Sequence, residues 1–184
     1  MTPEAATTAF LDDLSRLGTQ QWLIRIVMLL GTLSVVAAEV IAGAALGVAY
    51  PIAVLVLATL AVALPDSSVG LFLMLAMAWH WTARVPDATS GWLLMAAFGL
   101  LVLHVGGILA SYGPSLLVLE ASLVRQWVVR AGRVAAVTVL VWFGVRFVSV
   151  LDLPASGLLF GAALTIVAGW ALVLGRQVSA SRDG

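Results

Sequence analysis

The stretch from Ser68 to Tyr112, SVGLFLMLAMAWHWTARVPDATSGWLLMAAFGLLVLHVGGILASY, decides the fold. Two apolar runs flank the polar connector from Arg84 to Gly91, and neither run contains Asp, Glu, Lys or Arg. A helix needs about 20 apolar residues to cross the hydrocarbon core of a bilayer, and a connector with Pro, Asp and Gly is typical of a loop. The stretch therefore predicts a transmembrane hairpin with helices over 69–84 and 92–112.

The composition of the whole chain excludes an ordinary soluble domain. Of its 184 residues, 62% are hydrophobic and only 10% are charged, whereas about a quarter are charged in soluble domains. Nine basic residues balance nine acidic ones, which argues against a nucleic-acid partner. All the basic residues are arginine, a bias typical of high-GC genomes such as those of actinobacteria. The absence of cysteine excludes disulfides, thiolate metal sites and a cysteine nucleophile.

The apolar pattern repeats on both sides of the hairpin and predicts an all-α, polytopic bundle of about six membrane spans. The run from Trp22 to Pro65 is too long for one span. We divide it at the small residues 42–47, because the following Tyr50-Pro51 suits the first turn of a helix. Four or five spans are the alternatives. The six expected spans cover residues 22–42, 47–65, 69–84, 92–112, 133–150 and 155–175.

Two further segments are amphipathic. Residues 1–21 predict a short helix on the membrane surface, with a frayed leader as the alternative. Residues 115–132 mix Leu and Val with Arg125 and Arg130, and the basic residue Arg133 follows directly. A helix with arginines on its polar side is typical of a segment lying at the membrane interface.

The distribution of arginines predicts the orientation. With six spans, both termini lie on the same side, and that side collects all the arginines except Arg84 and Arg146. The positive-inside rule then places both termini, including the tail 176–184, in the cytoplasm. We therefore expect a multi-pass protein of the bacterial plasma (inner) membrane.

Ionisable residues inside spans are candidates for function because they are costly there. Glu39, His80 and Arg146 lie near the outer ends of the first, third and fifth expected spans. At this common depth they could form a polar cluster in which each charge offsets the desolvation of another. In the alternative interpretation, each side chain extends separately to the outer interface.

The second histidine of the hairpin, His104, lies nearer the middle of its span. A bis-histidine haem site would need His80 and His104 at one depth, but the residue opposite His80 is about Ala96. A metal site would need further ligands at helical spacing. The sequence predicts no metal or cofactor, and His104 is expected to be a buried polar group bonded to a neighbouring helix.

The last expected span carries a stripe of small residues at a spacing of four. Such stripes let helix backbones approach closely, so this face should pack against another helix of the same or another subunit. The sequence contains no nucleotide-binding glycine loop and no convincing catalytic triad, and it therefore predicts a protein that is not an enzyme. The stripe consists of Gly157, Gly161, Thr165 and Gly169.

Four motifs carry a resemblance to a family: PDSSVGLFLMLAMAWHWTARVPDATSGW at 65–92, LVLHV at 101–105, Gly113-Pro114, and LEASLVRQWVVRAGR at 119–133. Over about residues 50–145 the chain resembles small actinobacterial integral membrane proteins found in gene clusters with a MoxR-type AAA+ ATPase. The resemblance implies a non-catalytic structural or accessory subunit of an inner-membrane complex for cell-envelope protein assembly or maturation. Its partners would be the lipid bilayer, other membrane subunits and the ATPase system. The alternative is a small transporter or channel that uses the cluster of Glu39, His80 and Arg146.

Overall fold

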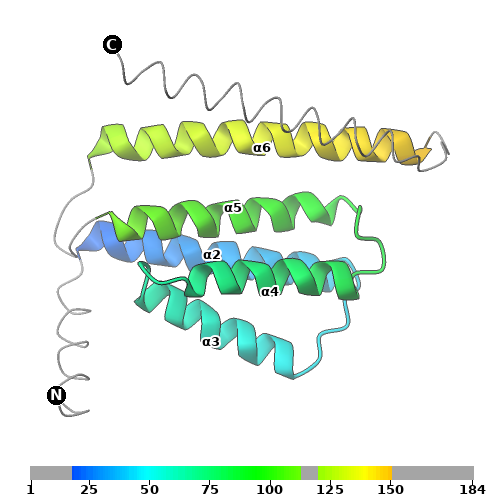
Figure 1. Ribbon diagram of the computed structural model, residues 1–184, viewed down its shortest axis with the longest axis horizontal. Coiled ribbons are helices and arrows are strands. Elements are labelled where there is room, and N and C mark those ends of the chain that lie inside the picture. The colour runs from blue at the N-terminus through cyan, green and yellow to red at the C-terminus, as the bar shows by residue number, and fades with distance from the viewer. Residues whose placement is uncertain (1–17, 113–119, 151–184) are drawn as a thin grey trace. The chain divides into compact units, whose positions relative to one another are not determined.

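The computed structural model describes residues 18–112 and 120–150, and these residues form five helices and no strand (Figure 1). This confirms the all-α prediction. The sixth expected span with its small-residue stripe, the tail, and nearly all of the N-terminal segment lie outside the described residues. The helices are α2 (Thr19–Ile41), α3 (Ala49–Ala63), α4 (Val69–Arg84), α5 (Trp92–Ser111) and α6 (Ala121–Val150).

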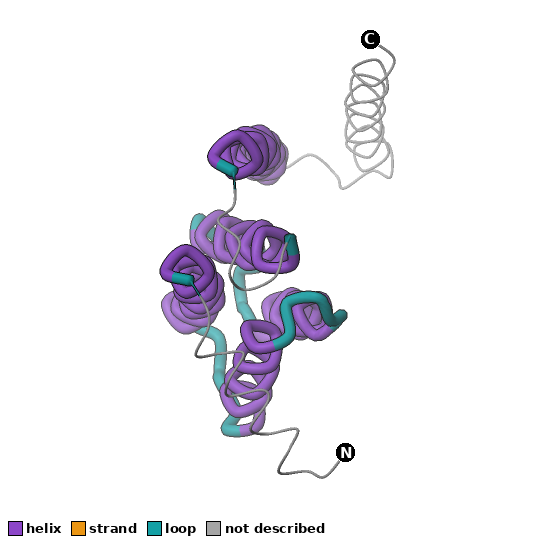
Figure 2. The backbone as a smooth tube through the Cα atoms, turned by 90° about the vertical axis from the view of Figure 1, so that its left-hand side faces the viewer, coloured by secondary structure: helices purple, strands orange, loops and turns teal. Residues whose placement is uncertain are grey.

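The chain forms two compact units, residues 1–139 and 140–184, and α2 to α5 lie in the first. Within this unit α2 packs most extensively against α5, and α3 packs against α4. Figure 2 shows these helices nearly along their axes. Close backbone approaches between the α2–α5 pair and the α3–α4 pair are fewer. These four helices of the unit are therefore two pairs, and buried apolar side chains of both pairs form one core.

Glycines allow the close approach of α2 and α5. A Cβ atom added at Gly99 would lie 2.6 Å from the carbonyl oxygen of Gly31 and 2.3 Å from Oγ of Ser34. A Cβ atom at Gly106 would lie 2.6 Å from Cγ of Met28. No side chain fits at these distances, so the α2–α5 pair depends on these small residues as closely packed membrane helices do.

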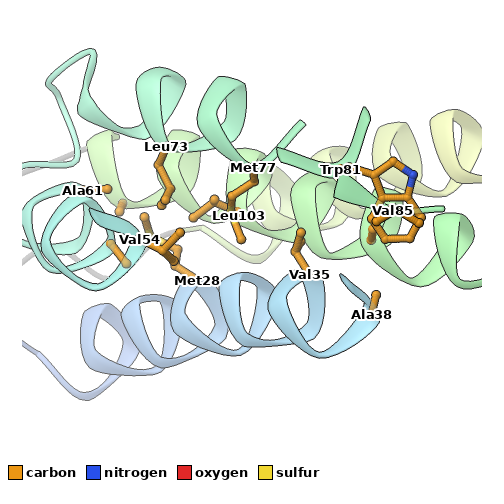
Figure 3. Close-up of a cluster of buried hydrophobic side chains, with 13 residues drawn as sticks. Met28, Val35, Ala38, Val54, Ala61, Leu73, Met77, Trp81, Val85 and Leu103 are labelled. Atoms are coloured by element: carbon orange, nitrogen blue, oxygen red, sulfur yellow. The ribbon is translucent and has the colours of Figure 1, made fainter. Parts of the chain in front are cut away.

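The core lies where side chains from all four helices converge (Figure 3). Every third or fourth residue of α2 is buried, which is the spacing of one helix face. The middle of this face is apolar or forms hydrogen bonds within the helix, whereas its two ends are polar. From one end to the other the face carries Gln21, Arg25, Met28, Thr32, Val35 and Glu39.

Three of the described helices are long and apolar enough to cross a membrane: α2, α5 and residues 121–147 of α6. The expected spans 47–65 and 69–84 fold as α3 and α4, which have 15 and 16 residues. At 1.5 Å per residue these helices are roughly 22–24 Å long, less than the roughly 30 Å thickness of a bilayer core. The count of six spans is therefore not confirmed.

The expected boundary between a surface helix ending at residue 132 and a span beginning at 133 is absent, because α6 is continuous from Ala121 to Val150. The segment contains no proline, and Gly132 by itself lowers helix stability by only about 1 kcal/mol. Arg125, Arg130 and Arg133 are exposed on this continuous helix. The guanidinium carbon of Arg130 lies 5.2 Å from the ring centroid of Trp127.

Candidate functional site

Three helix ends bring three polar side chains together. Glu39 lies two residues before the end of α2, Tyr50 is the second residue of α3, and His80 lies one turn before the end of α4. The chain reverses after α2 through Gly43, whose φ of 87° favours glycine. The backbone N–H of Ala44 donates to the carbonyl of Glu39 at 2.9 Å. The connections therefore place these residues at one end of the bundle, and we name them the Glu39–His80–Tyr50 cluster.

The cluster is compact, with Glu39 buried and Tyr50 and His80 partly buried. Oε1 of Glu39 lies 3.2 Å from Nδ1 of His80, and the Glu39 side chain is 0% exposed. The His80 side chain is 11% exposed, so it is the member of this pair that reaches the surface. The rings of Tyr50 and His80 stack with centroids 3.5 Å apart and planes 5° from parallel. The Tyr50 hydroxyl interacts with the Glu39 carboxylate.

The polar atoms of the cluster lack well-aligned hydrogen bonds. Within the described residues, neither carboxylate oxygen of Glu39 has one, nor do Nδ1 of His80 and the Tyr50 hydroxyl. The 3.2 Å contact between Glu39 and His80 is therefore an electrostatic contact of poor alignment. These atoms contact one another without a well-aligned hydrogen bond, and native proteins keep few buried polar atoms in that state. Their concentration in one place makes this end of the bundle the candidate site.

The chemistry available to the cluster is proton binding. A carboxylate and an imidazole in contact can share one proton, which then belongs to the pair. Imidazole changes charge in the physiological pH range, and a stacked aromatic face attracts its cationic form. No group of three or more His, Cys, Asp or Glu side chains suited to a metal occurs in the part of the chain that the structure describes.

The other predicted site residues have different outcomes. Arg146 lies on α6 in the second compact unit, so its membership of the cluster stays a prediction. The expectation for His104 is wrong, because its side chain is exposed while its neighbours Leu103 and Gly106 are buried. The 3.6-residue period of α5 turns Leu103 and Gly106 toward the core and directs His104 away from it.

Trp81 supports the cluster from the loop side. Trp81 is only 5% exposed, whereas Trp79 is 75% exposed. Its indole N–H donates to the carbonyl of Ala88 at 3.1 Å. Trp81 directly follows His80, and its hydrogen bond holds the connector after α4 in place.

Sequence reasoning missed three polar residues, of which Gln21 and Arg25 are buried and Tyr50 is partly buried. Tyr50 was used only to locate a helix start, although it is the polar residue in the first turn of α3. Gln21 and Arg25 are 3% and 8% exposed at the opposite end of α2. The signal for Gln21 and Arg25 was their spacing, since they continue the buried face that ends at Glu39.

Comparison with known proteins assigns no family. No protein-family model matches the chain, and no curated protein or solved structure matches it. The geometry of the cluster therefore carries the functional inference.

Proposed function

We propose that this chain is a small proton-linked transporter or channel, in which Glu39 and His80 carry the proton. One observation carries the proposal: the fully buried Glu39 carboxylate lies 3.2 Å from an imidazole that reaches the surface. Ionisable residues inside membrane segments are costly and mark proton relays and substrate pathways. His80 is the entry point for the proton, and Glu39 is the inner acceptor.

Protonation of the pair would change the forces between the helices. With one shared proton, Glu39 on α2 and His80 on α4 attract each other across the interface of the two helix pairs. A second proton neutralises Glu39 and removes this attraction. Because Glu39 and His80 lie where the α3–α4 pair meets the α2–α5 pair, loss of this attraction would favour movement of one pair relative to the other, as bundles move in transporters.

The short α3–α4 pair suggests a particular membrane topology. We propose that α2 and α5 span the bilayer and that α3 and α4 form either two short spans or a re-entrant hairpin, which is tolerated where it is buried in protein. If α6 and the expected span 155–175 also cross the membrane, both arrangements leave the two termini on the same side, and the arginine distribution favours the cytoplasm of a bacterial cell. The chain lacks cysteine, so Ser67→Cys and Pro86→Cys can be labelled separately. A re-entrant hairpin predicts that Ser67→Cys is shielded from cytoplasmic reagents, whereas two spans predict ready labelling.

Proton flux into proteoliposomes tests the function. The purified chain, reconstituted with a trapped pH dye and an imposed membrane potential, should conduct protons. Glu39→Gln and His80→Ala should each lower the flux by about tenfold or more, as loss of a proton-transfer group does. Trp79→Phe, which changes an exposed neighbour of His80, should leave it unchanged. Flux that survives both site substitutions would refute the proposal.

A second candidate function is a non-catalytic accessory subunit of a larger inner-membrane complex. The observation that favours it is His104, which is exposed near the middle of α5, a helix apolar enough to span a membrane. An imidazole facing lipid is unfavourable, and a helix from another membrane subunit would cover it. The complex we propose is the one that the resemblance implies, namely a MoxR-type ATPase system for cell-envelope protein assembly. Purification in mild detergent should then yield partner subunits, and a lone monomer would contradict this alternative.

A further inference from the structure

A second buried polar site lies at the opposite end of α2 from Glu39. Gln21 and Arg25 are one helical turn apart, and Arg25 lies 14 residues before Glu39, about 21 Å along the helix axis. The Nη1 group of Arg25 donates to the carbonyl of Val62. Val62 belongs to the last turn of α3, where carbonyls lack partners within the helix. Arg25 therefore caps the end of α3 and holds it against α2.

This capping leaves much of the site's hydrogen-bonding capacity unused. Within the described residues, Nε of Arg25 and both polar atoms of the Gln21 amide are buried without a hydrogen-bond partner. No described acidic side chain forms an ion pair with Arg25. The negative end of a helix dipole amounts to only about half a charge. Among the described residues, the buried charge of Arg25 thus has no full counter-charge.

The unused donors fit a phosphate group. The edge of a guanidinium that includes Nε matches two oxygens of a phosphate, and the Gln21 amide offers a further donor one turn away. The turn after α3 leads directly into α4, where the N-cap residue Ser68 forms no side-chain cap and Oγ of Ser67 accepts from the N–H of Val69 at 3.4 Å. A Cβ atom added at Gly70, in the first turn of α4, would meet nothing within 4 Å. Basic pockets between membrane helices bind the head groups of anionic lipids in this way.

We propose that Gln21 and Arg25 form a binding site for a phosphate group, supplied either by the head group of an anionic phospholipid or by free phosphate. The phosphate accepts from the Nε edge of Arg25 and from the Gln21 amide, while Nη1 continues to cap α3. This site does not depend on proton transfer at Glu39, and the two can be tested separately.

Native mass spectrometry of the full chain in mild detergent tests the site. The chain is titrated with dioleoyl phosphatidylglycerol, dioleoyl phosphatidylcholine or inorganic phosphate. We expect preferential retention of phosphatidylglycerol if a lipid supplies the phosphate, and saturable binding of inorganic phosphate alone if the free ion does. In either case Arg25→Gln and Gln21→Leu should each weaken binding by about tenfold or more, as loss of a hydrogen bond to a charged group predicts.

Two controls keep the result interpretable. Arg84→Gln removes an exposed arginine at the opposite end of the bundle and should bind as the wild type does. Gln21→Leu leaves the bond between Arg25 and Val62 in place, so it should fold even if Arg25→Gln does not. Equal binding of the two lipids without phosphate binding would overturn the proposal, and so would wild-type binding by Gln21→Leu.

Discussion

Replacing His80 with leucine should destabilise the bundle, because it removes the imidazole partner of the buried Glu39 carboxylate. At 3.2 Å, the attraction between opposite unit charges is about 5 kcal/mol for an effective dielectric constant of about 20. Desolvation of the pair cancels much of this, and removal of one partner of a buried pair typically costs about 3–5 kcal/mol. Because His80 is partly exposed, we expect about 3 kcal/mol for His80→Leu.

The double variant separates this charge effect from the loss of packing. Glu39→Gln in the His80→Leu background removes the charge that needs a partner, and should recover about 2 kcal/mol of the loss. This coupling would exceed the roughly 0.6 kcal/mol that is average for polar contacts between membrane helices. Lowering the pH should also reduce the cost of His80→Leu, because a protonated Glu39 needs no counter-charge.

The free energy of unfolding can be measured in mixed micelles by tryptophan fluorescence at pH 7.5 and pH 5. His104→Leu is the matched control, because that histidine is exposed, and it should change stability by less than about 0.5 kcal/mol. A His80→Leu variant as stable as this control would refute the electrostatic role of the pair, as would strictly additive effects of His80→Leu and Glu39→Gln.

Two other predictions concern the frame around the site. Gly99→Ala should destabilise the α2–α5 pair by about 1–3 kcal/mol through overpacking, whereas Gly70→Ala, at an open position, should be neutral or stabilising. Thermal unfolding of both variants measures this difference. A Gly99→Ala variant as stable as the wild type would contradict the observed close approach of α2 and α5. Trp81→Phe should lose about 1 kcal/mol with its hydrogen bond to Ala88 and increase hydrogen exchange in the connector 85–91. Trp79→Phe, at a 75% exposed position, should do neither, and equal effects of the two substitutions would contradict the role of the hydrogen bond.

The helices could be predicted from the sequence because their ends carry local signals. The expected helix 69–84 has the bounds of α4, and 92–112 differs from α5 by one residue, since Ser68, Arg84 and Gly91 mark turns around apolar runs. The continuity of α6 could not be predicted from its polar first half. Polar residues suggested a separate surface helix, but no residue near position 133 has a helix propensity low enough to end the helix.

The candidate site could be predicted in part. Equal depth in the first and third expected spans, which run in the same direction, suggested that Glu39 and His80 lie near each other, and the structure places them in contact. The depth of a residue in the membrane does not tell in which direction its side chain points around the helix axis, and the exposure of His104 was missed for this reason. The stacking of Tyr50 on His80 and the capping of α3 by Arg25 depend on how the two helix pairs meet, and no local pattern encodes that arrangement.

The central claim is that Glu39 holds an exchangeable proton shared with His80, and infrared spectroscopy of the reconstituted chain tests it most directly. A pH titration should show a protonated carboxyl band that is absent in Glu39→Gln and whose midpoint shifts in His80→Ala. His104→Leu should leave the band and its midpoint unchanged. A titration identical in the wild type and Glu39→Gln would contradict the claim, as would a midpoint that does not respond to His80→Ala.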